Sequence, residues 1–155
     1  MIARIRTRFA CTADALWEQI MQPRSLVFVA APILVFVSAD GGRLPARWEE
    51  GVSYPLRLFF LGLLPLGRHT IRLVQIDADS YTILSEEHGQ LARVWNHRIH
   101  FREVAPGQVF YSDEIDIRAG LLTPFIWWFA HLFYRHRQRR WKQWLRRAVR
   151  EAPRA

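Results

Sequence analysis

The chain has 155 residues, half of them apolar and 14% aromatic, which is enough to build one hydrophobic core and excludes an intrinsically disordered chain. Its formal net charge of +8 comes from 22 Lys and Arg residues against 14 Asp and Glu residues, and the excess lies between positions 135 and 150, where there is no acid. Cys11 is the one cysteine, so the sequence excludes an intrachain disulfide and a cysteine-rich zinc site, and it is typical of a reducing, cytoplasmic compartment. We therefore expect a single domain over residues 1–155.

The first forty residues predict a strand, two short helices and a second strand. The opening residues alternate apolar and polar side chains, as a strand with one buried face does. Thr12 suits the N-cap of the first helix, and Pro23 is expected to end that helix. The predicted ranges are 2–9 and 33–37 for the strands, and 13–21 and 25–31 for the helices.

The stretch from residue 48 to residue 118 predicts further strands joined by short turns. Turn signals such as His88-Gly89 and Pro106-Gly107 separate segments rich in strand-forming residues. Short connections favour an antiparallel meander. The predicted strands cover residues 54–61, 67–77, 80–88, 91–103 and 109–118.

An aromatic and basic segment from residue 124 to about residue 150 predicts one long helix, with Pro124 in its first turn. A curved antiparallel sheet must cover its apolar face, and this helix is long enough to cover it. We therefore expect an α+β fold in which the sheet wraps around the C-terminal helix and leaves a space for an apolar small molecule. The expected core face of the helix has Arg137 in its middle and consists of Ile126, Ala130, Phe133, Tyr134, Trp141, Trp144, Leu145 and Ala148.

A second apolar group lies on the opposite side of the same helix. Two interpretations are open: the short helices over 13–31 cover this group, or it forms an exposed patch for a partner or a membrane. The group consists of Phe125, Trp128, Phe129 and Leu132.

The last two predicted strands carry the most specific pattern, because alternation turns an acid toward the core. Asp113 shares its face with apolar residues, and a buried carboxylate is costly unless it is paired. We expect Asp113 to contact His97 across the hairpin, Arg137 from the helix, or both. A bulge or an odd-numbered loop around Pro106-Gly107 would keep both apolar sets inward and place Asp113 opposite residues 99–101. The inward set of the first strand is Trp95, His97, Ile99 and Phe101.

These patterns resemble the helix-grip ligand-binding (SRPBCC) superfamily, which includes START domains, birch-pollen allergen and polyketide cyclases. The resemblance covers nearly the whole chain, and the final helix is similar to a bacterial branch. It implies a cavity between sheet and helix for lipids, polyketides or other apolar compounds, but it does not imply catalysis. The residues that carry it are Ala13-Asp14-Ala15-Leu16-Trp17, Trp95 to Phe101, Gly107, Tyr111-Ser112-Asp113 and Phe133-Tyr134-Arg135.

Eight side chains are candidates for ligand binding, and neither a catalytic residue nor a cofactor is assigned. His97 and Asp113 form either a core pair that fixes strand register or a polar handle that orients a ligand or acts as an acid and base in a cyclase-like enzyme. Arg137 is either the partner of Asp113 or a clamp for a ligand carboxylate. The candidates are Trp48, Tyr54, Phe60, Trp95, His97, Asp113, Tyr134 and Arg137.

No metal site is predicted from the spacing of the histidines. His97 and His100 point to opposite faces of one strand, and His131 and His136 are five residues apart on a helix.

The basic stretch Arg135–Arg150 supports a different hypothesis, in which the protein is a membrane-surface or interaction module. Arg and Trp together suit anionic lipid headgroups. The alternative is a solvated face, because the helix dipole favours basic residues near a C-terminus. Nucleic acid is not expected, since no recognition motif accompanies the charge, and the sequence leaves the oligomeric state open.

Overall fold

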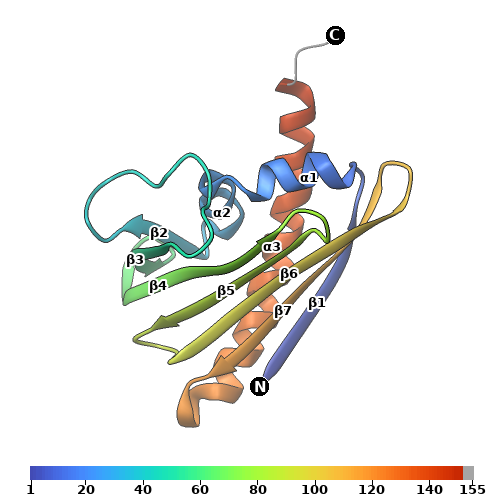
Figure 1. Cartoon of the computed structure of the whole chain (residues 1–155). Coiled ribbons are helices and arrows are strands. Elements are labelled where there is room, and N and C mark those ends of the chain that lie inside the picture. Colours follow the sequence, from blue (N-terminus) through green and yellow to red (C-terminus); the bar gives the residue numbers. More distant parts are fainter. Residues whose placement is uncertain (152–155) are drawn as a thin grey trace.

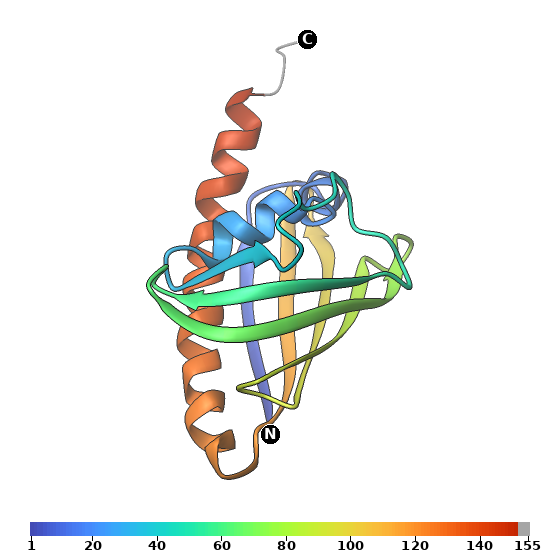
Figure 2. The same ribbon diagram turned by 90° about the vertical axis from the view of Figure 1, so that its left-hand side faces the viewer.

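Seven strands form one antiparallel sheet in the computed structural model, which describes the backbone of residues 1–151 and the side chains of residues 1–148. The strands are β1 (Ile2–Phe9), β2 (Leu34–Ser38), β3 (Ser53–Phe60), β4 (Leu64–Asp77), β5 (Thr82–Gly89), β6 (Val94–Ala105) and β7 (Gln108–Arg118). Their order in the sheet is β1-β7-β6-β5-β4-β3-β2, so β3 to β7 form the predicted meander, and β2 and β1 extend it at its two edges. The sheet is strongly curved (Figures 1 and 2).

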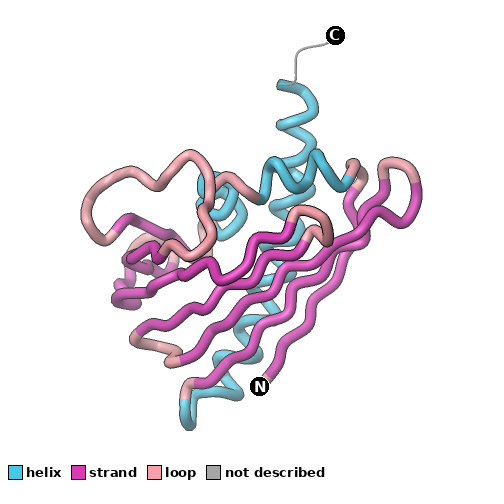
Figure 3. Tube along the Cα trace, viewed as in Figure 1, coloured by secondary structure: helices cyan, strands magenta, loops and turns pink. Residues whose placement is uncertain are grey.

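The helices gather on one side of this sheet (Figure 3). They are α1 (Ala13–Ile20), α2 (Pro23–Ala30), the short 3₁₀ helix η1 (Gly120–Leu122) and α3 (Thr123–Glu151). The Thr12 hydroxyl accepts a hydrogen bond of 3.2 Å from the backbone N–H of Ala15, which confirms the predicted N-cap of α1. Pro23 does not merely end α1, because it opens α2, where its fixed φ suits the first helical turn.

The long helix α3 lies along the concave side of the sheet, so the predicted helix-grip arrangement is confirmed (Figure 2). Its predicted core face is buried at Phe133, Tyr134 and Trp141, and Trp144 is half-buried. Within residues 1–151, no helix combines the length and the apolar character needed to cross a bilayer.

The β6–β7 hairpin has the predicted register. Asp113 lies opposite Ile99, and the ladder shifts between Glu103 and Ala105, next to the Pro106-Gly107 turn. This bulge keeps the alternating inward residues of β7 buried from Val109 to Ile117. The acid at position 113 is therefore carried into the core with its apolar neighbours.

The outer apolar side at the start of α3 is exposed, so of the two open interpretations, burial under the short helices is wrong for most of that group. Phe125 is 74% exposed, Trp128 is 63% exposed and Leu132 is 45% exposed. Phe129 alone is half-buried and packs against Phe60, with ring centroids 6.5 Å apart.

The short helices α1 and α2 instead pack against α3 further toward its C-terminus. The ring of Phe28 in α2 lies 3.9 Å from the guanidinium of Arg140, and Gln19 in α1 accepts a hydrogen bond of 2.9 Å from Trp144. These contacts fall on the C-terminal half of α3. The outer side of the first turns, at Phe125 and Trp128, is left to solvent.

Candidate functional site

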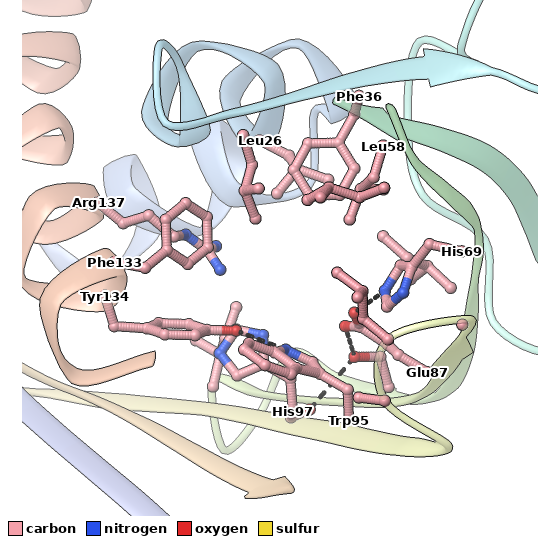
Figure 4. Close-up of a pocket in the computed structure, with 18 of the residues that line it drawn as sticks. Leu26, Phe36, Leu58, His69, Glu87, Trp95, His97, Phe133, Tyr134 and Arg137 are labelled. Carbon is pink, nitrogen blue, oxygen red and sulfur yellow. Dashed lines mark hydrogen bonds and ion pairs between the residues drawn. The ribbon is translucent and has the colours of Figure 1, made fainter. Parts of the chain in front are cut away.

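A cavity of about 160 Å³ lies between the concave face of the sheet and α3 (Figure 4). Its walls come from α2, from strands β2 to β6 and from one side of α3. Most of the lining is apolar, with Leu26, Phe36, Leu58 and Phe133 facing the space (Figure 4). A dry apolar cavity of about 150 Å³ is large enough to bind benzene. The space therefore suits an aromatic ring or a short apolar chain.

Five of the eight candidate residues line this cavity. They are Trp48, Trp95, His97, Tyr134 and Arg137. Trp95 donates a hydrogen bond of 3.3 Å to the Tyr134 hydroxyl, and the two rings stack with centroids 6.3 Å apart. This contact joins the sheet wall of the cavity to the helix wall.

The other three candidates do not line the cavity, but each of them contacts a residue that does. Tyr54 packs edge-on against Trp48 with ring centroids 4.8 Å apart, and Phe60 packs against Phe129. Asp113 is 1% exposed and is bonded to the lining residue His97.

Three side chains hold the buried carboxylate of Asp113. His97 Nε2 lies 2.9 Å from Asp113 Oδ1, and the Tyr111 hydroxyl donates to the same oxygen at 2.8 Å. The side-chain amide of Gln138 donates to Oδ2 at 2.9 Å. Burial raises the pKa of Asp113, but the bond to His97 and the positive charges of His97 and Arg137 outweigh it and keep that pKa below its usual value. The predicted contact with His97 is confirmed.

A second pair of a histidine and a carboxylate lines the cavity and was missed in the sequence. His69 Nε2 lies 2.8 Å from Glu87 Oε2, and the Ser85 hydroxyl donates to Glu87 Oε1 at 2.6 Å. Burial raises the pKa of Glu87, but the bond to His69 and the charges of His69 and His97 bring it below its usual value. Alternation in β5 places Glu87 on the same face as Ile83 and Ser85, so the β5 pattern predicts an inward acid at position 87 just as the β7 pattern does at position 113.

Arg137 occupies the helix wall of the cavity without an ion pair. It is 6% exposed, and its guanidinium carbon lies 4.7 Å from the ring centroid of Tyr134. Among the described side chains, no carboxylate oxygen lies within 4.0 Å of its nitrogens, and Nε has no hydrogen-bond partner. The place expected for Arg137 beside Asp113 is taken by Gln138, the next residue along the helix.

A family model for a domain of unknown function, DUF8410, matches residues 7–145. The chain belongs to this family. No curated protein matches it in sequence.

Solved structures of bacterial proteins share the fold over almost the whole chain. The protein CV1439 from Chromobacterium violaceum has a TM-score of 0.73 at 10% identity, covering 93% of this chain and 96% of that one. A START superfamily protein from Mycobacterium smegmatis has a TM-score of 0.67 at 12% identity, covering 95% and 98%. The Zhui aromatase/cyclase from Streptomyces sp. R1128 has a TM-score of 0.63 at 13% identity, covering 100% and 99%.

These likenesses establish the helix-grip fold of START-like and polyketide cyclase-like proteins. At such identities they concern the fold alone, because one fold hosts binding proteins and enzymes alike. What the site of this DUF8410 member does must come from its own residues. They form an apolar cavity with the Arg137 guanidinium on its helix wall. Glu87, paired with His69, lies on the sheet wall, and Asp113, paired with His97, lies behind it.

Proposed function

We propose that the protein binds an apolar small molecule, of lipid, polyketide or aromatic type, in the cavity between the sheet and α3. The observation that carries this proposal is the lining itself: apolar side chains from both walls face an unfilled space, with a few polar groups among them. Core side chains ordinarily interlock, so a space of this size within a small domain is unusual for a structure that only has to be stable.

The test is to measure occupancy of the cavity directly. Native mass spectrometry of gently purified protein, with organic extraction of any bound compound, should detect an apolar ligand. Thermal shift against a panel of apolar compounds should show stabilisation by those that fit, since a ligand that binds only the folded state raises its stability.

A matched pair of variants makes the test specific for the cavity. Leu58→Trp adds a ring to the lining and should abolish the thermal shift, whereas Leu63→Trp places the same ring at a position that is 86% exposed and should leave it unchanged. Absence of a bound compound together with no shift for any panel member would overturn the proposal.

A second candidate function, attachment to an anionic membrane surface, is favoured by the outer side of α3. Phe125 and Trp128 are exposed near its start, and Arg135, Arg139 and Arg146 are exposed further along the same helix. Bilayer interfaces accept aromatic rings and attract basic side chains. The side chain of Arg150, the last of the basic stretch, lies outside the described residues.

Cosedimentation with vesicles tests this second candidate. Vesicles containing phosphatidylglycerol should retain the protein at low salt, and vesicles of phosphatidylcholine alone should not. Replacing Arg135, Arg139 and Arg146 together by Glu should release it. Equal recovery in the supernatant for both vesicle types would rule this function out.

A further inference from the structure

The guanidinium of Arg137 is aimed into the cavity from the helix wall. Figure 4 shows its nitrogens pointing away from α3 toward the open space, above the ring of Tyr134. The side chain is 94% buried by its neighbours, since its exposed fraction is 6%. Arginine stays charged in proteins, so this is a cation held in apolar surroundings.

Among the side chains of residues 1–148, no carboxylate forms an ion pair with this cation. Asp113 already accepts hydrogen bonds from His97, Tyr111 and Gln138, and Glu87 accepts from His69 and Ser85. Within the described side chains, neither carboxylate forms an ion pair with Arg137, and its Nε has no partner. A buried charge without an ion pair is costly, which suggests that the guanidinium nitrogens facing the cavity take their partner from outside the chain.

Charged and titratable side chains line both ends of the cavity, with Arg68 and His97 among them, but they differ in their pairing. Arg137 projects from α3, while the Glu87 carboxylate lies with His69 on the opposite, sheet side (Figure 4). Glu87 is already engaged by His69 and Ser85, whereas Arg137 has no ion pair among the described side chains, so an anionic end of a ligand would be attracted to the helix wall. Between these walls the lining is apolar, with Leu26, Phe36 and Leu58 above the space (Figure 4).

We propose that the ligand is an apolar carboxylic acid, aromatic or aliphatic, whose carboxylate is bound by Arg137 while its apolar body fills the cavity. The planar guanidinium offers parallel N–H donors that match two carboxylate oxygens, which a neutral carbonyl or hydroxyl does not provide. This inference rests on the proposed function, and it adds the chemical class of the ligand.

The experiment compares acids with their own methyl esters, so that each pair differs in charge but hardly in apolar surface. The probes are benzoic acid with methyl benzoate and hexanoic acid with methyl hexanoate, titrated by calorimetry and by quenching of Trp fluorescence. For at least one of the two pairs, wild-type protein should bind the acid about tenfold or more tightly than the ester, since hydrogen bonds to a charged group contribute more than neutral ones.

Variants assign this preference to Arg137. Arg137→Met should bring the affinity for the acid down to that for the ester and leave the ester unchanged, and Arg137→Lys should retain part of the preference. Arg140→Met is the matched control, because Arg140 lies on the same helix but contacts Phe28 and is not part of the cavity lining. It should preserve the wild-type ratio.

The outcomes separate this inference from the proposed function. If wild-type protein binds acid and ester equally, the carboxylate inference is wrong and the cavity function stands. If neither member of any pair binds and no compound copurifies, both fail. If Arg137→Met does not fold, the acid-to-ester ratios of the wild type and of Arg137→Lys still decide the matter.

Discussion

The side-chain amide of Gln138 donates a hydrogen bond of 2.9 Å to Asp113 and another of 3.1 Å to the backbone carbonyl of Ile5. One residue of α3 thereby joins the helix to β7 and β1, at the edge of the sheet whose strands do not line the cavity. The neighbouring Arg137 is left free to face the cavity.

Replacing Asp113 by Asn should destabilise the protein by about 3 kcal/mol, because the new amide N–H₂ must face a donor from His97, Tyr111 or Gln138 in a buried site. Urea unfolding followed by circular dichroism measures the change. Asp116→Asn is the control: its carboxylate is partly exposed and pairs with Arg118 at the surface, so the loss should stay below about 1 kcal/mol. Equal losses for both variants would show that the buried network contributes little.

Stability should fall in acid because of Asp113 and Glu87. Both have a folded-state pKa below the usual values of 3.8 and 4.5, so the unfolded chain takes up protons more readily than the folded one. Their contribution is full above about pH 5 and is lost as the pH falls through the folded-state pKa values. Urea midpoints measured between pH 3 and pH 7 should show a plateau followed by a decline. A midpoint unchanged at pH 3 would contradict the shifts.

Cys11 should react slowly with thiol reagents in the native protein. Burial, helped by the negative charge of Glu103, raises the pKa of its thiol to about 11. At pH 8 only about 0.1% of the thiol is then ionised, and the thiolate is the reactive form. The rate of reaction with 5,5′-dithiobis(2-nitrobenzoate) should rise strongly in denaturant, and similar rates in both states would argue against the shift.

Two phenylalanines eight residues apart on α3 should differ strongly in how much stability is lost when each is replaced by Ala. Phe133→Ala should cost about 3–5 kcal/mol, because its ring is buried between the sheet and the helix. Phe125→Ala should change stability by less than about 0.5 kcal/mol, since that ring is 74% exposed. Thermal unfolding of both variants checks the pair, and a large loss for Phe125→Ala would mean that its exposed surface is covered by something else in solution.

The fold was predictable because alternation and turn residues agree along most of the chain. The inward acid at position 113 and the bulge beside Pro106-Gly107 follow from requiring one buried face on each strand of the β6–β7 hairpin. The β4–β5 hairpin obeys the same rule, so Glu87 was within reach of the sequence. Its partner His69 was not, because the ladder shift between Leu73 and Gln75 displaces the two strands in a way that no residue pattern reveals.

The features that the sequence could not predict are the positions of whole helices relative to one another and to the sheet. A helical wheel gives the faces of α3 but not its rotation about its own axis, and a small rotation decides whether position 137 or position 138 reaches Asp113. It also cannot tell where along α3 the short helices pack. They contact Arg140 and Trp144 and leave Phe125 uncovered.

The pairing of β1 with β7 bears on how the site comes into being during synthesis. Ile2 is synthesised well before Asp116, with which it pairs, so β1 has no neighbour in the sheet until β7 has left the ribosome. The helix wall, with Arg137, follows later still. A ligand that needs both walls can therefore be captured only after α3 has been made, so this helix completes the binding site and the helix-grip fold in one step.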